Sequence, residues 1–238
     1  MGALSLLYKD SCPITDDISV RIPSVREIVE NEQEYYDLVS MLTSMPIDMM
    51  VQLDDAGINF AEISEYDLFL MLFNSVRAID TSLIFGDLDL SGFTPAIHEE
   101  SGTVVLIDPD SGAKFDPLVQ GKIAATLRRI HHLEKNTKRP GNEEARTYMI
   151  QRAREKQRRR KKAARESQLE PLIVSMVNTE QFKYNYETVL DMNIFQFNES
   201  VRQIIRKIDY DNRMHGVYAG TVDASKLDSD KLTWLYKK

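Results

Sequence analysis

Cysteine is nearly absent from the sequence, and no long hydrophobic run is present. Cys12 is the only cysteine among 238 residues, which excludes an internal disulfide and any zinc site built from several cysteines. No apolar run approaches the roughly 20 residues needed to cross a bilayer, so no membrane partner is expected. The N-terminal residues lack the basic segment of a signal peptide. We therefore expect an intact chain in a reducing, cytoplasmic compartment.

Sequence signatures of catalysis are missing as well. The chain has no GxSxG motif, no Walker-type phosphate loop and no GxGxxG motif. Its histidines show neither HxxxH nor HExxH spacing, and the adjacent His131 and His132 should point to different faces of a helix. The other two, His98 and His215, are isolated in the sequence. We therefore expect a protein that is not an enzyme, with no catalytic residue, no metal and no cofactor.

Two groups of carboxylates deserve comparison with metal sites. The first imitates the start of a calcium loop, at Asp87, Asp89, Ser91 and Gly92. The position that should carry a bidentate Glu is His98, so turn formation is favoured over calcium binding. The second group is close enough in sequence to suggest two-metal catalysis: Asp54, Asp55, Glu62, Glu65 and Asp67. Because these acids lie at a helix end and a helix start, capping explains them equally well.

Charge is distributed unevenly along the chain. The formal net charge is −7, and 28% of the residues are charged. Residues 1–100 contain 19 acidic and 4 basic side chains, whereas residues 146–168 contain 10 basic and 2 acidic ones. Opposite charges on two parts of one chain predict complementary docking surfaces, which steer partners and set their register.

The first 139 residues are predicted to form an acidic, helical domain. Alternating residues at 14–23 predict a short strand. Ser24 and Glu27 fit a capping box for one amphipathic helix that continues to about residue 42. Pro46 is expected to start a second helix, and Ser64 with Asp67 a third.

Within this domain, residues 82–116 change their pattern. Apolar and β-branched runs alternate with Gly, Pro and Asp, which predicts a small β-hairpin or a three-stranded insert. Pro117 then opens another amphipathic helix. The apolar side of that helix is expected to contain Leu118, Ile123, Leu127 and Ile130.

Residues 140–170 are predicted to form a long basic helix or connector. Pro140-Gly141 marks a joint, and the acids that follow suit a helix N-terminus. From Arg154 to Lys162 there is no apolar side chain, so this part must project into water, cross between lobes or lie on something negative. The candidate binding surface consists of its cations: Arg152, Arg154, Lys156, Arg158, Arg159, Arg160, Lys161, Lys162 and Arg165.

Residues 171–238 are predicted to form a small C-terminal helical domain. Three helices are expected, near residues 170–178, 185–193 and 194–209. The apolar face of the third should be buried, with Phe197, Val201, Ile204, Ile205 and Ile208. Trp234 is expected to anchor the chain end against this bundle. The fold class is therefore mainly α (α+β).

The cationic segment leaves two kinds of partner open. Nucleic acid needs cations along a phosphate lattice, and single strands also need interleaved aromatic rings. Tyr148 alone lies beside the segment, and the acidic first hundred residues would repel nucleic acid. A protein partner is therefore favoured, and a nucleic-acid-binding accessory factor that uses residues 146–166 is the alternative.

Two stretches carry a family resemblance. "ISVRIPSVREIVENEQEYYDLVSMLTSMPIDMMVQLDD" (18–55) and "FKYNYETVLDMNIFQFNESVRQIIRKIDYDNRMHGVYAG" (182–220) cover about a third of the chain. They resemble tail-assembly and virion-associated structural proteins of tailed bacteriophages of Gram-positive hosts. The resemblance implies a tail-assembly chaperone or a virion component, present in the host cytoplasm during assembly or in the virion. Its implied partners are other phage structural or tail proteins, together with self-association.

Overall fold

The computed structural model describes residues 6–98, 102–160 and 166–235. Helices dominate: α1 (Val25–Glu30), α2 (Glu32–Thr43), α3 (Met50–Asp55), α4 (Glu65–Val76), α5 (Ser82–Phe85), α6 (Pro117–Ile130), α7 (Glu143–Arg160), α8 (Leu169–Val177) and α9 (Ile194–Tyr218). Short 3₁₀ helices are η2 (Pro46–Met49), η3 (Ala224–Lys226) and η4 (Ser229–Leu232). The strands are β1 (Ser11–Pro13), β2 (Ser19–Arg21), β3 (Thr94–Ile97), β4 (Val104–Ile107) and β5 (Lys114–Phe115). The predicted mainly α fold is confirmed.

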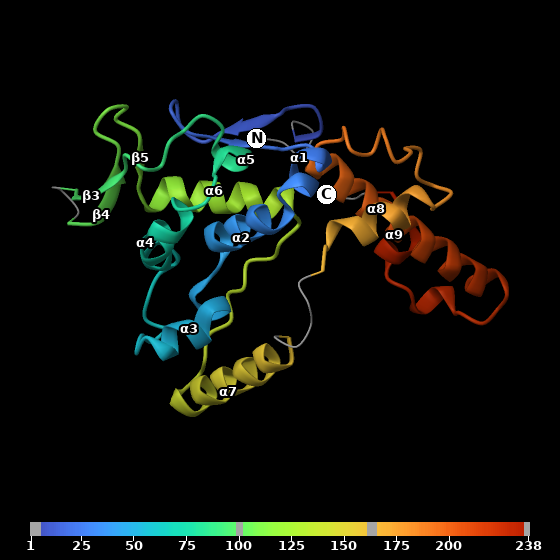
Figure 1. Ribbon diagram of the computed structural model, residues 1–238. Coiled ribbons are helices and arrows are strands. Elements are labelled where there is room, and N and C mark those ends of the chain that lie inside the picture. The colour runs from blue at the N-terminus through green and yellow to red at the C-terminus, as the bar shows by residue number, and fades with distance from the viewer. Residues whose placement is uncertain (1–5, 99–101, 161–165, 236–238) are drawn as a thin grey trace.

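Helices α2 and α6 lie side by side at the centre of the molecule (Figure 1). The β1–β2 hairpin and α5 cover one side of this pair, and the β3–β4–β5 sheet lies at one end. Helices α8 and α9 lie at the other end, and α3 and α7 form a separate layer below. The molecule therefore has a central body with two extensions, one containing α7 and the other containing α9.

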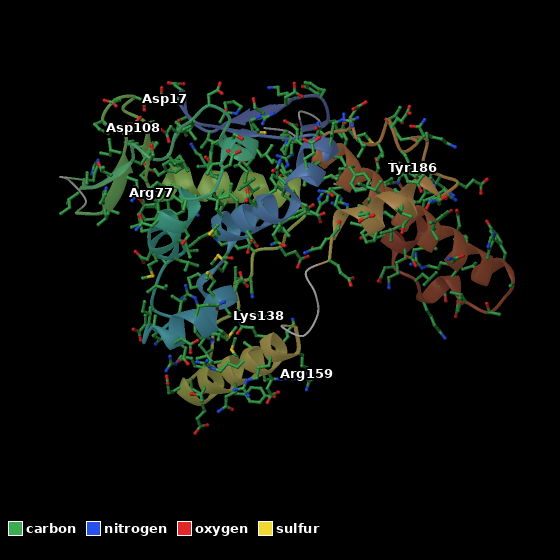
Figure 2. The ribbon with its side chains drawn as sticks, viewed as in Figure 1. Asp17, Arg77, Asp108, Lys138, Arg159 and Tyr186 are labelled. Carbon is green, nitrogen blue, oxygen red and sulfur yellow. The ribbon has the colours of Figure 1, made fainter. Side chains whose placement is uncertain are left out.

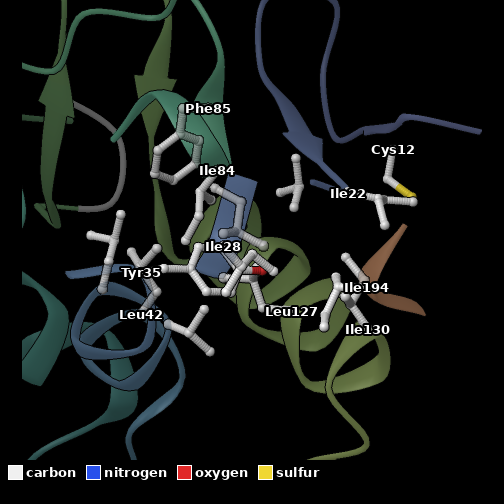
Figure 3. Packing of buried hydrophobic residues seen from close by; sticks show 14 of the residues in the cluster. Cys12, Ile22, Ile28, Tyr35, Leu42, Ile84, Phe85, Leu127, Ile130 and Ile194 are labelled. Carbon is white, nitrogen blue, oxygen red and sulfur yellow. The ribbon is translucent and has the colours of Figure 1, made fainter. Parts of the chain in front are cut away.

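One large core occupies the central body. Its buried side chains run from Leu6 to Ile130 and resume at Leu169 through Phe197, so both sides of the basic segment contribute to it. Figure 3 shows the meeting of Ile28 and Tyr35 with Leu127 of α6. Burial of these apolar surfaces is the main stabilising contribution.

The N-terminal helices confirm the predicted caps and correct one length. Ser24 with Glu27 and Ser64 with Asp67 both form reciprocal capping boxes. The helix expected to run unbroken to residue 42 is interrupted at Asn31, whose backbone (φ −137°, ψ 35°) leaves the helical region. Before the break Val29, expected on the apolar face, is exposed, and after it Tyr35 is buried.

The β insert is confirmed as three antiparallel strands in the order β3-β4-β5. Ala96 opposes Val105, and Leu106 opposes Phe115. Phe115 packs against a group of buried aromatic rings, and its carbonyl accepts a hydrogen bond of 2.7 Å from the Tyr66 hydroxyl. In the helix that follows, the buried face contains Val119, not the expected Leu118, which is exposed. Leu118 lies in the first turn, on the side of α6 away from the core.

The middle of the three expected C-terminal helices does not form. Residues 185–192 are turns, because the Asn185 side chain accepts hydrogen bonds from the backbone N–H groups of Glu187 and Thr188. The carbonyls of Leu190 and Met192 then accept hydrogen bonds from the first N–H groups of α1. These hydrogen bonds dock the turns on the start of α1.

Glu32 fixes the chain where it re-enters the body after α7. Its carboxylate accepts hydrogen bonds from the Ser167 hydroxyl (2.6 Å) and from the backbone N–H groups of Gln168 (2.7 Å) and Leu169 (3.0 Å). Burial raises the pKa of Glu32, but these hydrogen bonds outweigh it and lower the pKa overall. A side chain of α2 therefore caps α8 across the molecule.

Helix α9 begins inside the core and then leaves it. Ile194, Phe195 and Phe197 are buried, whereas residues 198–235, all of them described, contain no buried side chain. The expectation that Ile205 and Ile208 are buried in a bundle is wrong, since they are 61% and 39% exposed. The returning chain contacts this part of α9 through Trp234, as expected: its carbonyl accepts a hydrogen bond from Gln203 Nε2, and its ring centre lies 5.7 Å from Lys207 Nζ.

Candidate docking surface on α7

Helix α7 is attached to the body through its first half. Ile150 is 5% exposed and packs into a second core, separate from the first. The other members of this core include four methionines, Met45, Met49, Met50 and Met149. Because the apolar residues of α7 end at Ala153, the rest of the helix has no apolar side chain to bury and continues beyond the core.

Arg154 adds a polar attachment. Its Nη2 atom lies 2.7 Å from Asp54 Oδ2 and 2.6 Å from Asp55 Oδ1, at the end of α3. Hydrogen bonds to Asp55 and Asp54 raise the pKa of Arg154. One residue of the predicted basic surface is therefore directed inward, and two members of the predicted acidic group act as its partners.

The other acids of that group also have structural partners. Glu65 bonds Arg128 Nη2 at 2.5 Å and Lys135 Nζ at 2.6 Å, which fixes the chain that descends from α6 to α7. Asp67 caps α4. Glu62 accepts a hydrogen bond from Asn59.

A groove of about 970 Å³ lies between α3 and α7. Three separate segments form it, and its lining is Ile47, Asp48, Met50, Val51, Gln52, Asn136, Lys138, Tyr148, Met149, Arg152, Ala153, Glu155, Lys156, Gln157 and Arg159. Figure 2 labels two of these cations, Lys138 and Arg159, on the side of the molecule where α7 lies. The groove thus combines an apolar floor with a cationic rim.

The structure divides the nine predicted surface residues into groups. Arg152, Lys156 and Arg159 line the groove, and the Arg152 guanidinium lies 5.7 Å from the centre of the Tyr148 ring. Arg158 is exposed but is not part of the lining. Arg160 ends α7. Lys161, Lys162 and Arg165 lie outside the described residues.

Sequence reasoning missed the groove itself. A partial signal was present in Met50 and Met149, which line the groove, because methionine is frequent on adaptable binding surfaces. The hydrophobic pattern of α7 alone could not show that Met50 and Ala153 border the same hollow.

The candidate metal residues take part in local structure. Asp89 accepts hydrogen bonds from the backbone and hydroxyl of Ser91, and these hydrogen bonds lower the pKa of Asp89. His98 follows β3 directly, and His215 is exposed near the end of α9. Within the three described ranges, no group of three or more potential ligand side chains is gathered for a metal ion. None of the helices in these ranges is long and apolar enough to cross a membrane.

The adjacent histidines contact different partners. Tyr35 Oη lies 2.8 Å from His131 Nε2. Burial, with a smaller effect of neighbouring His132, lowers the pKa of His131 to about 4, so the ring is neutral at pH 7. His132 packs against Phe195, and its Nε2 atom lies 3.5 Å from Glu199.

Comparison with known proteins gives one match. Residues 159–237 match the family model described as the second domain of YomV, a protein of a Bacillus phage region. No curated protein and no solved structure matches the chain. The matched part begins at the end of α7 and includes α8 and α9. The C-terminal third of the chain is thus similar to a domain of a phage-region protein.

Proposed function

We propose that this protein is a non-enzymatic phage morphogenesis protein, either a tail-assembly chaperone or a tail or virion component. It binds other phage structural proteins through the α7 surface. The match to a phage-type domain supports the phage context. The observation that carries the binding role is that α7, anchored through its first half, exposes cations at Arg152, Lys156, Arg158 and Arg159.

Electrostatics favours an acidic protein partner for this surface. Arg154 of the same helix already bonds two aspartates of α3, which illustrates the pairing that its neighbours can make with another protein. The whole chain carries a formal charge of −7. A local cationic surface on an acidic molecule orients an incoming partner more than it adds affinity.

A salt series tests this proposal. Binding to purified tail proteins of the same phage should weaken steadily as salt rises, because the contacts are exposed charges. Reversing Arg152, Lys156, Arg158 and Arg159 to Glu should lower affinity by at least about tenfold. The matched control variant substitutes Glu for four exposed lysines outside α7, namely Lys114, Lys122, Lys183 and Lys226. Absent binding, salt-insensitive binding or equal loss in both variants would contradict the proposal.

Single-stranded nucleic acid is a second candidate partner, because Tyr148 is 59% exposed beside Arg152. An exposed ring next to cations is the pattern on which unpaired bases stack. This alternative expects affinity that falls steeply with salt and is nearly uniform across sequences. Fluorescence anisotropy with labelled DNA and RNA oligonucleotides at low salt decides it, since no binding under those conditions eliminates it.

A further inference from the structure

We propose that the groove between α3 and α7 receives an acidic amphipathic helix of a protein partner. This inference rests on the proposed function and assigns its contact to one place and one kind of ligand. The surface of α7 outside the groove, including Arg158, then contributes only long-range attraction.

The volume of the groove is suited to a short α-helix. An α-helix is about 10 Å wide with side chains and rises about 5.4 Å per turn. The groove volume of about 970 Å³ corresponds to roughly two turns of such a helix. Two turns present two or three side chains on one face, at the i, i+3/i+4 and i+7 positions used in helix-in-groove recognition.

The floor of the groove is suited to apolar side chains. Met50, Met149 and Ala153 are half-buried there, beside the buried Val51 and Ile47. Methionine has an unbranched, polarizable side chain that adapts to different apolar shapes. Ala153 leaves space where a larger residue would fill the hollow.

The rim of the groove selects for negative charge. Lys138, Arg152, Lys156 and Arg159 border it, against two acids. One acid, Asp48, already accepts hydrogen bonds from Met45 N (2.9 Å) and Asn136 Nδ2 (2.8 Å). Carboxylates on the flanks of an incoming helix therefore meet an excess of cations.

The same lining disfavours nucleic acid in the groove. Tyr148 is the only aromatic residue among the described lining residues, and Arg152 lies over its ring. Binding of unpaired bases depends on several stacking rings along the path of the strand. The methionine side chains at the floor of the groove do not provide such stacking rings.

The test uses the full-length protein and a labelled 18-residue probe peptide. Leu occupies the i, i+3, i+4 and i+7 positions of the peptide, and Glu occupies its flanks. The control peptide has the same composition in scrambled order, which keeps the charge and removes the apolar face. We expect the amphipathic peptide to bind at least about tenfold more tightly in fluorescence anisotropy.

Two matched pairs of variants locate the contact. Lys156 lines the groove and Arg158 does not. Lys156→Glu and Arg158→Glu each reverse one charge on α7. Ala153→Phe fills the groove without changing charge, and Gln151→Phe adds the same ring outside it. We expect the affinity for the amphipathic peptide to fall about tenfold in the first variant of each pair and less than about twofold in the second. Circular dichroism confirms that each variant is folded.

The outcomes separate this inference from the proposed function. Equal losses for Lys156→Glu and Arg158→Glu, or no effect of Ala153→Phe, overturn the groove while leaving charge-based binding intact. Competition by a single-stranded oligonucleotide but not by the amphipathic peptide also overturns it. Binding of neither peptide nor tail proteins rejects both proposals. Self-association that Ala153→Phe abolishes identifies a second copy as the source of the helix and supports the inference.

Discussion

Helices α7 and α9 both begin on the body of the molecule and then extend beyond it, but they expose different kinds of surface. The free part of α7 is cationic, with Lys156, Arg158 and Arg159 exposed. The free part of α9 exposes Ile205 and Ile208 and is covered on one side by the chain that returns from Tyr218. Their attachments to the body differ too, since α7 packs in the small methionine-rich core and the start of α9 packs in the large one.

The difference teaches where each helix obtains its stability. Ile194, Phe195 and Phe197 contribute to the same core as α2 and α6, so the start of α9 should unfold only with the whole body. Helix α7 depends on Met149, Ile150 and the bond from Arg154 to α3. We therefore expect α7 to open locally at a smaller free energy than the root of α9.

The largest expected effect compares two isoleucines of α9. Ile194 is 0% exposed and Ile205 is 61% exposed, so an Ile→Ala substitution is made in the core at one position and on the surface at the other. Ile194→Ala should lower the free energy of unfolding by about 2–5 kcal/mol, through lost burial and a cavity. Ile205→Ala should change it by less than about 0.5 kcal/mol. Urea unfolding measures both, and similar losses would show that the outer part of α9 is also packed.

An intermediate effect concerns pH at the end of α6, where the chain turns towards α7. The pKa of His131 is about 4 in the fold, below its unfolded value of roughly 6.5. Between these values the unfolded chain binds more protons, so stability is complete above pH 6.5 and falls as pH decreases towards 4. The loss should be about 2 kcal/mol after allowance for the partial exposure of the ring.

Substitution isolates this contribution. His131→Gln removes the titration and keeps a side chain that can hydrogen-bond Tyr35, so the unfolding free energy should vary less between pH 6.5 and 4. His215→Gln, on the exposed part of α9, should keep the wild-type dependence. Urea unfolding at several pH values checks both, and an unchanged slope in His131→Gln would refute the assignment.

The smallest expected effect tests the attachment of α7. Arg154→Ala removes the bonds to Asp54 and Asp55, whereas Arg158→Ala removes an exposed cation of the same helix. We expect faster amide hydrogen exchange in α7 for Arg154→Ala, with global unfolding nearly unchanged, since exposed ion pairs contribute little. Equal exchange rates in the two variants would mean that Met149 and Ile150 hold α7 without help.

Local signals in the sequence predicted much of this fold. The capping boxes at Ser24 and Ser64, and the turn-rich β insert, depend on neighbouring residues and were predicted correctly. The turns at 185–192 depend on hydrogen bonds to α1, more than 150 residues away in the chain, and the apolar pattern there was misread as a helix. The exposure of Ile205 has a similar origin, because periodicity predicts an apolar face but not what covers it.

The candidate site was predictable only in part. The run of cations is visible in the sequence, but the inward pairing of Arg154 with Asp54 depends on the packing of α7 on α3. The groove is formed by residues 47–52, 136–138 and 148–159, and their proximity follows from the path of the chain after α6. No pattern within one of these segments indicates the other two.

The continuity of α9 fixes a distance and a direction. Its 25 residues rise about 1.5 Å each, so the end of the helix stands about 37 Å from its start. Removing a single residue between Val201 and Tyr218 would shorten that span by about 1.5 Å and rotate the tip by about 100° about the axis. The number of residues in α9 therefore sets the distance and the angle, relative to the body, of anything that its outer surface contacts.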